Sequence, residues 1–235
     1  MGLVCLVWGD FEPGQAMPAD FPHRTLLAYA ADLFIIAASA AVLWRRTAAW
    51  GAAALVAYFA LIVVILMNGR VILEYYREYG AYSSAAEQLA IAAAGLIVYA
   101  RFAAIDAALA ARLTRISQMV FGVCAILFGG AHFFYLNLTV PLVPKWLPPS
   151  PLFWAYATGI CHIAAGIAIL SGVQARLAAI LLTAMYASFT PLVHLPIVVA
   201  DPRTYMNWTE NALNLALTGA AWVVADSLAV KGKGR

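Results

Sequence analysis

Charged residues are scarce in this 235-residue chain, since Asp, Glu, Lys and Arg together make up 11% of it. An ordinary soluble domain carries about 25% charged side chains. Because 65% of the residues are hydrophobic, the chain cannot cover its own surface with polar groups. A soluble globular fold is therefore not expected, and lipid is the solvent that suits the apolar excess.

Basic runs and cysteine pairs are also missing. The formal charge of +3 is spread along the chain without a stretch of four or more Lys or Arg, so nucleic-acid binding is not expected. The cysteines Cys5, Cys124 and Cys161 form no Cys-x-x-Cys pair, which argues against a disulfide framework and a zinc ribbon. Isolated cysteines in apolar stretches are typical of buried small hydrophobic residues.

Long apolar stretches, rich in Ala and Leu and without strand-like alternation, predict an all-α polytopic transmembrane bundle. A spanning helix needs about 20 mostly apolar residues, and seven segments meet this requirement. They are residues 25–44, 47–67, 83–104, 116–137, 151–172, 176–199 and 208–228. Residues 1–8 are apolar as well, but a helix of this length rises only about 12 Å, so we expect a short N-terminal stump.

Basic residues are distributed unevenly between the two sides of these spans. Nine lie on the side that holds the C-terminus and five on the other, whereas the acidic residues lean the opposite way. An excess of Lys and Arg marks the cytoplasmic side of a membrane. We therefore expect the C-terminus, with its basic tail at 231–235, to lie in the cytoplasm.

The two halves of the chain show a weak internal similarity that keeps its order. Residues 27–30 (LAYA) align with residues 154–157 (WAYA), and other pairs follow at similar spacing. A repeat of this kind predicts two parallel four-helix halves. We place them at 1–105, with a truncated first helix, and at 116–230, joined by a cytoplasmic linker at 106–115.

Ionisable side chains within the predicted spans are candidate functional residues, because each costs about 2.5–3.5 kcal/mol at the centre of a bilayer. The second half offers His132, His162, His194 and Glu210, one on each of its four helices. If they converge on a cavity, the histidines can bind a metal, shuttle a proton or donate to a quinone carbonyl. Metal binding is the weaker option, because no two histidines lie at i and i+3 or i+4. Alternatively, His132, His194 and Glu210 hydrogen-bond to one another and only fix the helix register.

The first half repeats these polar positions less faithfully. Its counterparts are Asp10, Asp32, Asn68 and Glu87. Asn68 takes the approximate place of His194, and Glu87 stands near the position of Glu210 or Asn211. Because no span of this half contains a histidine, we expect the first half to be mainly structural or to pair with the second.

The second half contains two prolines near His194 and a proline-rich loop. Pro191 and Pro196 bracket His194, and each removes a backbone donor, which either frees carbonyls for a polar ligand or only kinks the helix to fit the bundle. Residues 143–149 (VPKWLPP) are too rich in proline to be helical. We expect this loop to cover the outer end of the second half.

Several short motifs carry a family resemblance. They are FGGAHF at 128–133, VPKWLP at 143–148, AYATG at 155–159, HIAAG at 162–166 and WTE at 208–210. With these motifs, residues 116–228 resemble the DoxX-like family of small bacterial inner-membrane proteins. The resemblance implies a four-helix membrane bundle in each half. The candidate ligand-binding or proton-relay residues also include Tyr156 and Trp208 from these motifs, and Asn211 from the repeat.

The resemblance also implies a function. Name-giving members of the family are similar to subunits of a thiosulfate:quinone oxidoreductase, so we expect an accessory subunit of a redox or quinone-linked system with a redox protein as partner. The chain has no heme-binding pair, flavin motif or Cys-x-x-Cys, so we expect the electrons to move elsewhere and the chain to have no catalytic activity of its own. Contact with a quinone is what the resemblance implies. The alternatives are a small-molecule or proton-coupled carrier, which the repeat favours, and a structural assembly factor.

Overall fold

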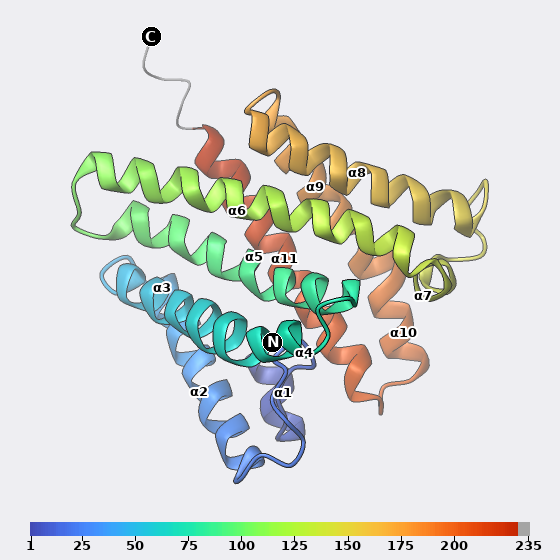
Figure 1. The fold of residues 1–235 in the computed structure, drawn as a ribbon, viewed down its shortest axis with the longest axis horizontal. Helices are drawn as coiled ribbons and strands as arrows, with labels where there is room; N and C mark the ends of the chain where they lie inside the picture. Colours follow the sequence, from blue (N-terminus) through green and yellow to red (C-terminus); the bar gives the residue numbers. More distant parts are fainter. Residues whose placement is uncertain (230–235) are drawn as a thin grey trace.

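The computed structural model describes residues 1–229, and within that range it contains helices and no strands (Figure 1). Seven helical segments are long and apolar enough to cross a membrane. They are Arg24–Leu43, Ala48–Glu74, Tyr79–Phe102, Ala107–Phe134, Pro151–Ser171, Ala175–Ala200 and Tyr205–Ala229. The predicted all-α, multi-pass membrane fold is therefore confirmed. The basic tail expected at 231–235 lies outside the described residues.

Five of the spans are single helices, and two are interrupted. The single helices are α2 (Arg24–Leu43), α5 (Tyr79–Phe102), α6 (Ala107–Phe134), α8 (Pro151–Ser171) and α11 (Tyr205–Ala229). The second span comprises α3 (Ala48–Val56), the π-helix η1 (Ala57–Asn68) and α4 (Gly69–Glu74), and the sixth comprises α9 (Ala175–Phe189), the π-helix η3 (Thr190–His194) and α10 (Leu195–Ala200). Short helices outside the spans are α1 (Gly2–Trp8), α7 (Leu136–Thr139) and the 3-10 turn η2 (Val140–Leu142).

The segment 106–115, expected to link the two halves, is almost entirely helical, because α6 begins at Ala107. The Asp106 carboxylate accepts a hydrogen bond from the backbone N–H of Leu109 at 2.9 Å, which caps the start of α6. The alanine-rich sequence that follows has high helix propensity. Only residues 103–106 connect α5 to α6, and α6 begins nine residues before the predicted span at 116–137.

The helices of the two halves pack in the same order. In the second half α6 packs on α8, α8 on α9 and α9 on α11, and in the first half α1 packs on α2, α2 on α3 and α3 on α5. The halves meet where α5 lies along α6 and against α11, and where α1 contacts α11 (Figure 1). The first helix of each half thus packs against the last helix of the other. The contact of α1 is the shorter one because α1 has only seven residues.

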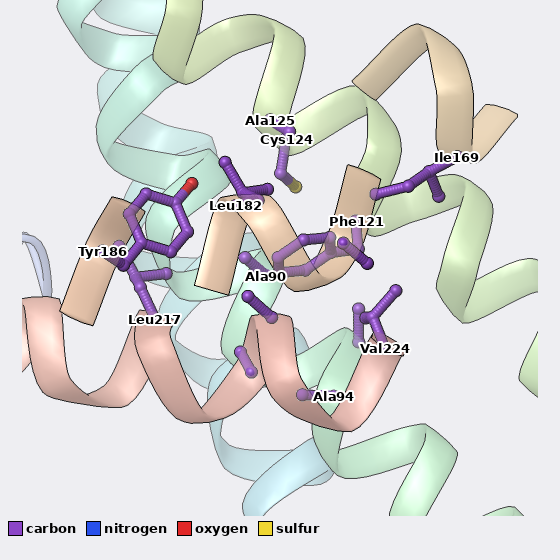
Figure 2. Close-up of a cluster of buried hydrophobic side chains, with 14 of the residues drawn as sticks. Ala90, Ala94, Phe121, Cys124, Ala125, Ile169, Leu182, Tyr186, Leu217 and Val224 are labelled. Carbon is purple, nitrogen blue, oxygen red and sulfur yellow. The ribbon is translucent and has the colours of Figure 1, made fainter. Parts of the chain in front are cut away.

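The main hydrophobic core lies where α5, α6, α8, α9 and α11 meet (Figure 2). Phe121, Leu182, Leu217 and Val224 fill its centre against Ala90 of α5. Alanines on α5 let neighbouring helices approach closely, and close packing is the main source of helix association in lipid.

Glycines bring α6 and α8 into direct backbone contact. Gly122 and Gly129 of α6 face Gly166 and Gly159 of α8. A Cβ atom on Gly129 would lie 2.6 Å from the Gly159 carbonyl oxygen, and one on Gly166 would lie 2.5 Å from the Gly122 carbonyl oxygen. Only glycine permits this separation of the two helices, which also holds His132 against α8.

The two π-helical segments occur at corresponding places in the two halves. In the first half the segment ends at Asn68, and in the second it ends at His194. These are the two residues that the sequence comparison equates. Each segment is followed by a short α-helix that completes its span.

Side-chain amides donate to backbone carbonyls where the helix register changes. Asn214 Nδ2 donates to the Tyr186 carbonyl oxygen at 3.0 Å, near Pro191, which has no N–H to donate. In the first half, Asn68 Nδ2 donates to the Val63 carbonyl oxygen at 3.1 Å. Such side chains satisfy backbone groups that an interrupted helix frees within a membrane.

Candidate functional site

A large cavity lies between α8 and α9. Its volume is about 1020 Å³, and its walls are mainly alanine, leucine and valine side chains with Met185 and Phe189. Along α8 the lining residues run from Trp154 to Ala168, about 21 Å at the rise of an α-helix. We call this cavity the α8/α9 groove.

The groove opens toward the surface that faces lipid. Leu177 and Leu181 of α9 line the groove and are 53% and 60% exposed. Cys161 of α8 also lines it and is exposed. The connection between α6 and α8 covers one end of the groove. Its lining residues are Thr139, Leu142, Val143, Pro144 and Leu147. This arrangement agrees with the covering role expected for the proline-rich loop.

Two histidine and two glutamate side chains line the groove. They are Glu87 of α5, His132 of α6, His194 of η3 and Glu210 of α11. The same four line a second cavity of about 160 Å³, so the two cavities adjoin. The structure thus places His132, His194 and Glu210 in one wall, together with Glu87, which the sequence analysis assigned to the first half.

Glu87 faces the second half because of where its helix packs. Helix α5 lies against both α6 and α11, so one face of α5 closes the cavity of the other half. Its neighbour Gln88 points to the first half, where its amide donates to Glu12. The internal repeat identifies equivalent positions on two helices, but it does not say which half a side chain serves.

The small cavity has largely aromatic walls. His162 is 2% exposed, and its ring centroid lies 4.9 Å from that of His132 and 5.3 Å from that of Tyr186. Phe128 and Phe189 complete this ring of side chains, with centroids 6.3 Å and 6.5 Å from His162. We call this space the ring cavity.

Backbone contacts fix which nitrogen of two histidines carries a hydrogen. His132 Nδ1 lies 2.9 Å from the Phe128 carbonyl oxygen, and His162 Nδ1 lies 2.7 Å from the Thr158 carbonyl oxygen. A carbonyl oxygen only accepts, so Nδ1 is the donor in both rings. In the neutral form of each ring, Nε2 is then a hydrogen-bond acceptor.

One buried hydroxyl group of the ring cavity has no partner. Tyr186 is 3% exposed, and its hydroxyl oxygen makes no hydrogen bond within residues 1–229. Over the same range, the structure contains no hydrogen bond among His132, His194 and Glu210. Mutual pairing of these three side chains, the alternative left open by the sequence, is therefore not the arrangement found.

Residues 9–23 fold back into the first half and occupy its polar positions. Tyr58 donates to Gln15 Oε1 at 2.7 Å, Asn68 donates to the Gly14 carbonyl oxygen at 2.8 Å, and Gln88 donates to Glu12 Oε2 at 2.8 Å. Glu12 and Gln15 are each 2% exposed. The loop of the first half therefore pairs with Tyr58, Asn68 and Gln88, whereas the second half leaves a cavity.

Glu12 connects this loop electrostatically to the cavity. Burial is the largest effect and, with the negative charge of Glu210, raises the pKa of Glu12 to about 7. Hydrogen bonds from the Gly14 backbone and the Gln88 side chain act in the opposite direction. The pKa of Glu12, in the loop of the first half, therefore depends in part on the charge of Glu210 on α11.

Several predicted site residues line neither cavity. Asp10 pairs with Arg24, and Trp208 donates to the Pro202 carbonyl oxygen at 2.9 Å. Those that lie elsewhere are Asp10, Asp32, Asn68, Tyr156, Trp208 and Asn211. For Asp10, Trp208 and Asn68, the contacts found are structural. Asp32 of α2 is buried, and one of its carboxylate oxygens is unpaired within the described range. No residue of α2 lines either cavity.

Sequence reasoning missed Tyr186, Glu12 and the role of Glu87. A signal existed for Tyr186, since Leu182, Tyr186 and Phe189 follow the i, i+4, i+7 spacing of an inward helix face. For metals, no group of three or more His, Cys, Asp or Glu side chains in the described part of the chain is placed to hold an ion.

Comparison with known proteins identifies one match. Residues 121–225 match a domain of unknown function (DUF8561), a segment that begins in α6 and ends in α11. No curated protein and no solved structure matches the chain. The match neither supports nor opposes the DoxX-like resemblance, but it covers the helices that carry His132, His162, His194 and Glu210.

Proposed function

We propose that this protein is an accessory membrane subunit that takes a lipid-soluble molecule of the quinone class from the bilayer and holds it in the α8/α9 groove. The main observation behind the proposal is a cavity of about 1020 Å³ that is lined by apolar side chains along its length and by histidine and glutamate side chains at one end. In this proposal the subunit binds the molecule and a partner protein moves the electrons.

The shape of the groove supports a long apolar tail. A groove about 21 Å long matches an extended hydrocarbon chain better than a compact solute, and the volume is at the upper end of typical ligand pockets, about 300–1,000 Å³. Exposed leucines at its mouth, Leu177 and Leu181, allow access from the lipid. The polar wall then offers contacts to a head group.

We further propose that the protein lies in a bacterial inner membrane with its C-terminus in the cytoplasm. The unequal distribution of Lys and Arg supports this orientation, and the DoxX-like resemblance supports the choice of membrane. The polar wall then lies in the outer half of the bilayer, where a redox partner would meet the head group.

A groove-filling substitution tests the proposal. Ala164 lines the groove, so Ala164→Trp should fill it, whereas Ile167 on the same helix is 55% exposed and does not line it. We expect quinones extracted from purified protein and quantified by mass spectrometry to fall at least about tenfold in Ala164→Trp and to stay unchanged in Ile167→Trp. Equal quinone content in wild type and both variants, or none in the wild type after growth and purification in mild detergent, would contradict the proposal.

A proton-coupled or small-molecule carrier is the second candidate, and one observation favours it. Both halves interrupt a span with a π-helix at corresponding places, and interrupted helices in corresponding positions are typical of transporters built from repeats. Proteoliposomes with a trapped pH-sensitive dye separate the candidates. A carrier should dissipate an imposed pH gradient without a partner protein, and an accessory subunit should not.

A further inference from the structure

The ring cavity has the size of one six-membered ring. Its volume is about 160 Å³, and an apolar cavity of about 150 Å³ in another protein holds benzene. Phe128, His162, Tyr186 and Phe189 surround it with flat side chains. An aromatic ring is therefore the head group that fits, since ring walls favour offset or edge contacts with another ring.

Two histidine nitrogens of this cavity are hydrogen-bond acceptors. The Nε2 atoms of His132 and His162 are acceptors in the neutral rings, because both Nδ1 atoms donate to backbone carbonyls. Ser83, His194 and the carboxyl groups of Glu87 and Glu210 also line it and can accept, and neither cavity is lined by Lys or Arg in the described part of the chain. A ligand that donates a hydrogen bond can therefore pair with either Nε2 atom.

The two oxidation states of a quinone differ in this property. The carbonyl oxygens of the oxidised ring only accept hydrogen bonds, whereas each hydroxyl group of the reduced ring both donates and accepts. A hydroxyl group can donate to a histidine Nε2 and accept from the unpaired Tyr186 hydroxyl group. A buried site that pairs a ligand hydroxyl group discriminates strongly against an analogue that lacks it.

We propose that the ring cavity binds the hydroxylated ring of a quinol in preference to the oxidised quinone, with His132 and His162 as acceptors and Tyr186 as a donor. This inference rests on the proposed function, in which the tail lies in the α8/α9 groove. The subunit then holds the reduced form of the molecule and presents it to a partner that oxidises quinol. A tenfold preference raises the two-electron midpoint potential of the bound couple by about 30 mV.

Binding of the two forms to the full-length protein in nanodiscs tests the preference. The probes are decylubiquinone and decylubiquinol, the latter kept reduced under anaerobic conditions, and the readout is the dissociation constant from quenching of tryptophan fluorescence. We expect the wild type to bind decylubiquinol at least about tenfold more tightly than decylubiquinone. Equal affinities, or tighter binding of the quinone, would overturn the preference and leave the proposed function standing. Binding of neither form would overturn both.

Three variants separate the contacts. His132→Phe keeps a ring but removes an acceptor, so it should weaken quinol binding about tenfold and leave quinone binding unchanged. Tyr186→Phe removes a hydroxyl group that lacks a protein partner, so the fold should persist while both forms bind more weakly by a similar factor. Tyr156→Phe changes a residue that is 39% exposed and lines neither cavity, so it should change neither affinity. Unchanged selectivity in His132→Phe, with the fold retained, would contradict the assignment of its Nε2 atom.

Discussion

Substitution of Gly166 tests how the contact between α6 and α8 holds the bundle together. A Cβ atom there would lie 2.5 Å from the Gly122 carbonyl oxygen and 2.6 Å from Ile126 Cγ1, well inside van der Waals contact. The two helices must separate by roughly 1 Å to admit it, since carbon atoms pack at about 3.5–4.0 Å. Overpacking of this kind costs about 1–3 kcal/mol, while the higher helix propensity of alanine returns up to about 1 kcal/mol.

The expected net effect of Gly166→Ala is therefore a destabilisation of about 1–2 kcal/mol. Gly219 in α11 provides a matched control, because a Cβ atom there meets nothing within 4 Å. Gly219→Ala should stabilise the protein by up to about 1 kcal/mol through propensity alone. Reversible unfolding in mixed micelles, followed by circular dichroism, measures both variants. Equal effects of the same sign in the two variants would refute the claim that close backbone approach of α6 and α8 stabilises the fold.

Two further predictions concern the first-half loop and the start of α6. Because the pKa of Glu12 is raised from 4.5 to about 7, the folded protein binds more protons than the unfolded chain in this range, so stability should fall as the pH rises from 4.5 to 7. Glu12→Gln should reduce the change in the free energy of unfolding across this pH range by up to about 3 kcal/mol. Unfolding at pH 4.5, 6 and 8 measures this change, and an unchanged pH dependence would contradict burial of the carboxyl group. Asp106→Ala removes the side-chain cap of α6 and should cost about 1 kcal/mol in the same assay, whereas Asp106→Asn, which can still cap the helix, should cost much less; equal losses would count against the cap.

Much of the fold follows from length and hydropathy, because a bilayer requires long apolar helices whose backbone groups are satisfied internally. The span predicted at 151–172 differs from Pro151–Ser171 by one residue. The start of α6 was missed because polar, alanine-rich residues can continue a helix beyond the hydrophobic segment. The π-helical segments were also beyond a hydropathy argument, since they depend on tertiary donors such as Asn214.

The candidate site was foreseen in part. The depth of His132, His194 and Glu210 along their helices predicts that they can meet, and the structure places all three in the wall of the α8/α9 groove. The contribution of Glu87 depends on the packing of α5 between the halves, which a repeat alone does not specify. Burial of Glu12 depends on a loop that folds back onto Gln88, and such a contact between distant residues leaves no periodic pattern in the sequence.

Photo-crosslinking tests the central claim most directly, namely that the α8/α9 groove holds a lipid-soluble molecule by its tail. A decyl-benzoquinol probe with a photoreactive group at the end of its chain is bound to the protein in nanodiscs, and labelled peptides are identified by mass spectrometry. We predict labels within residues 154–168 and 177–194, lost when excess decylubiquinol competes. Labels spread evenly over the lipid-facing helices, or concentrated on α2 and α3 and insensitive to competition, would contradict the account.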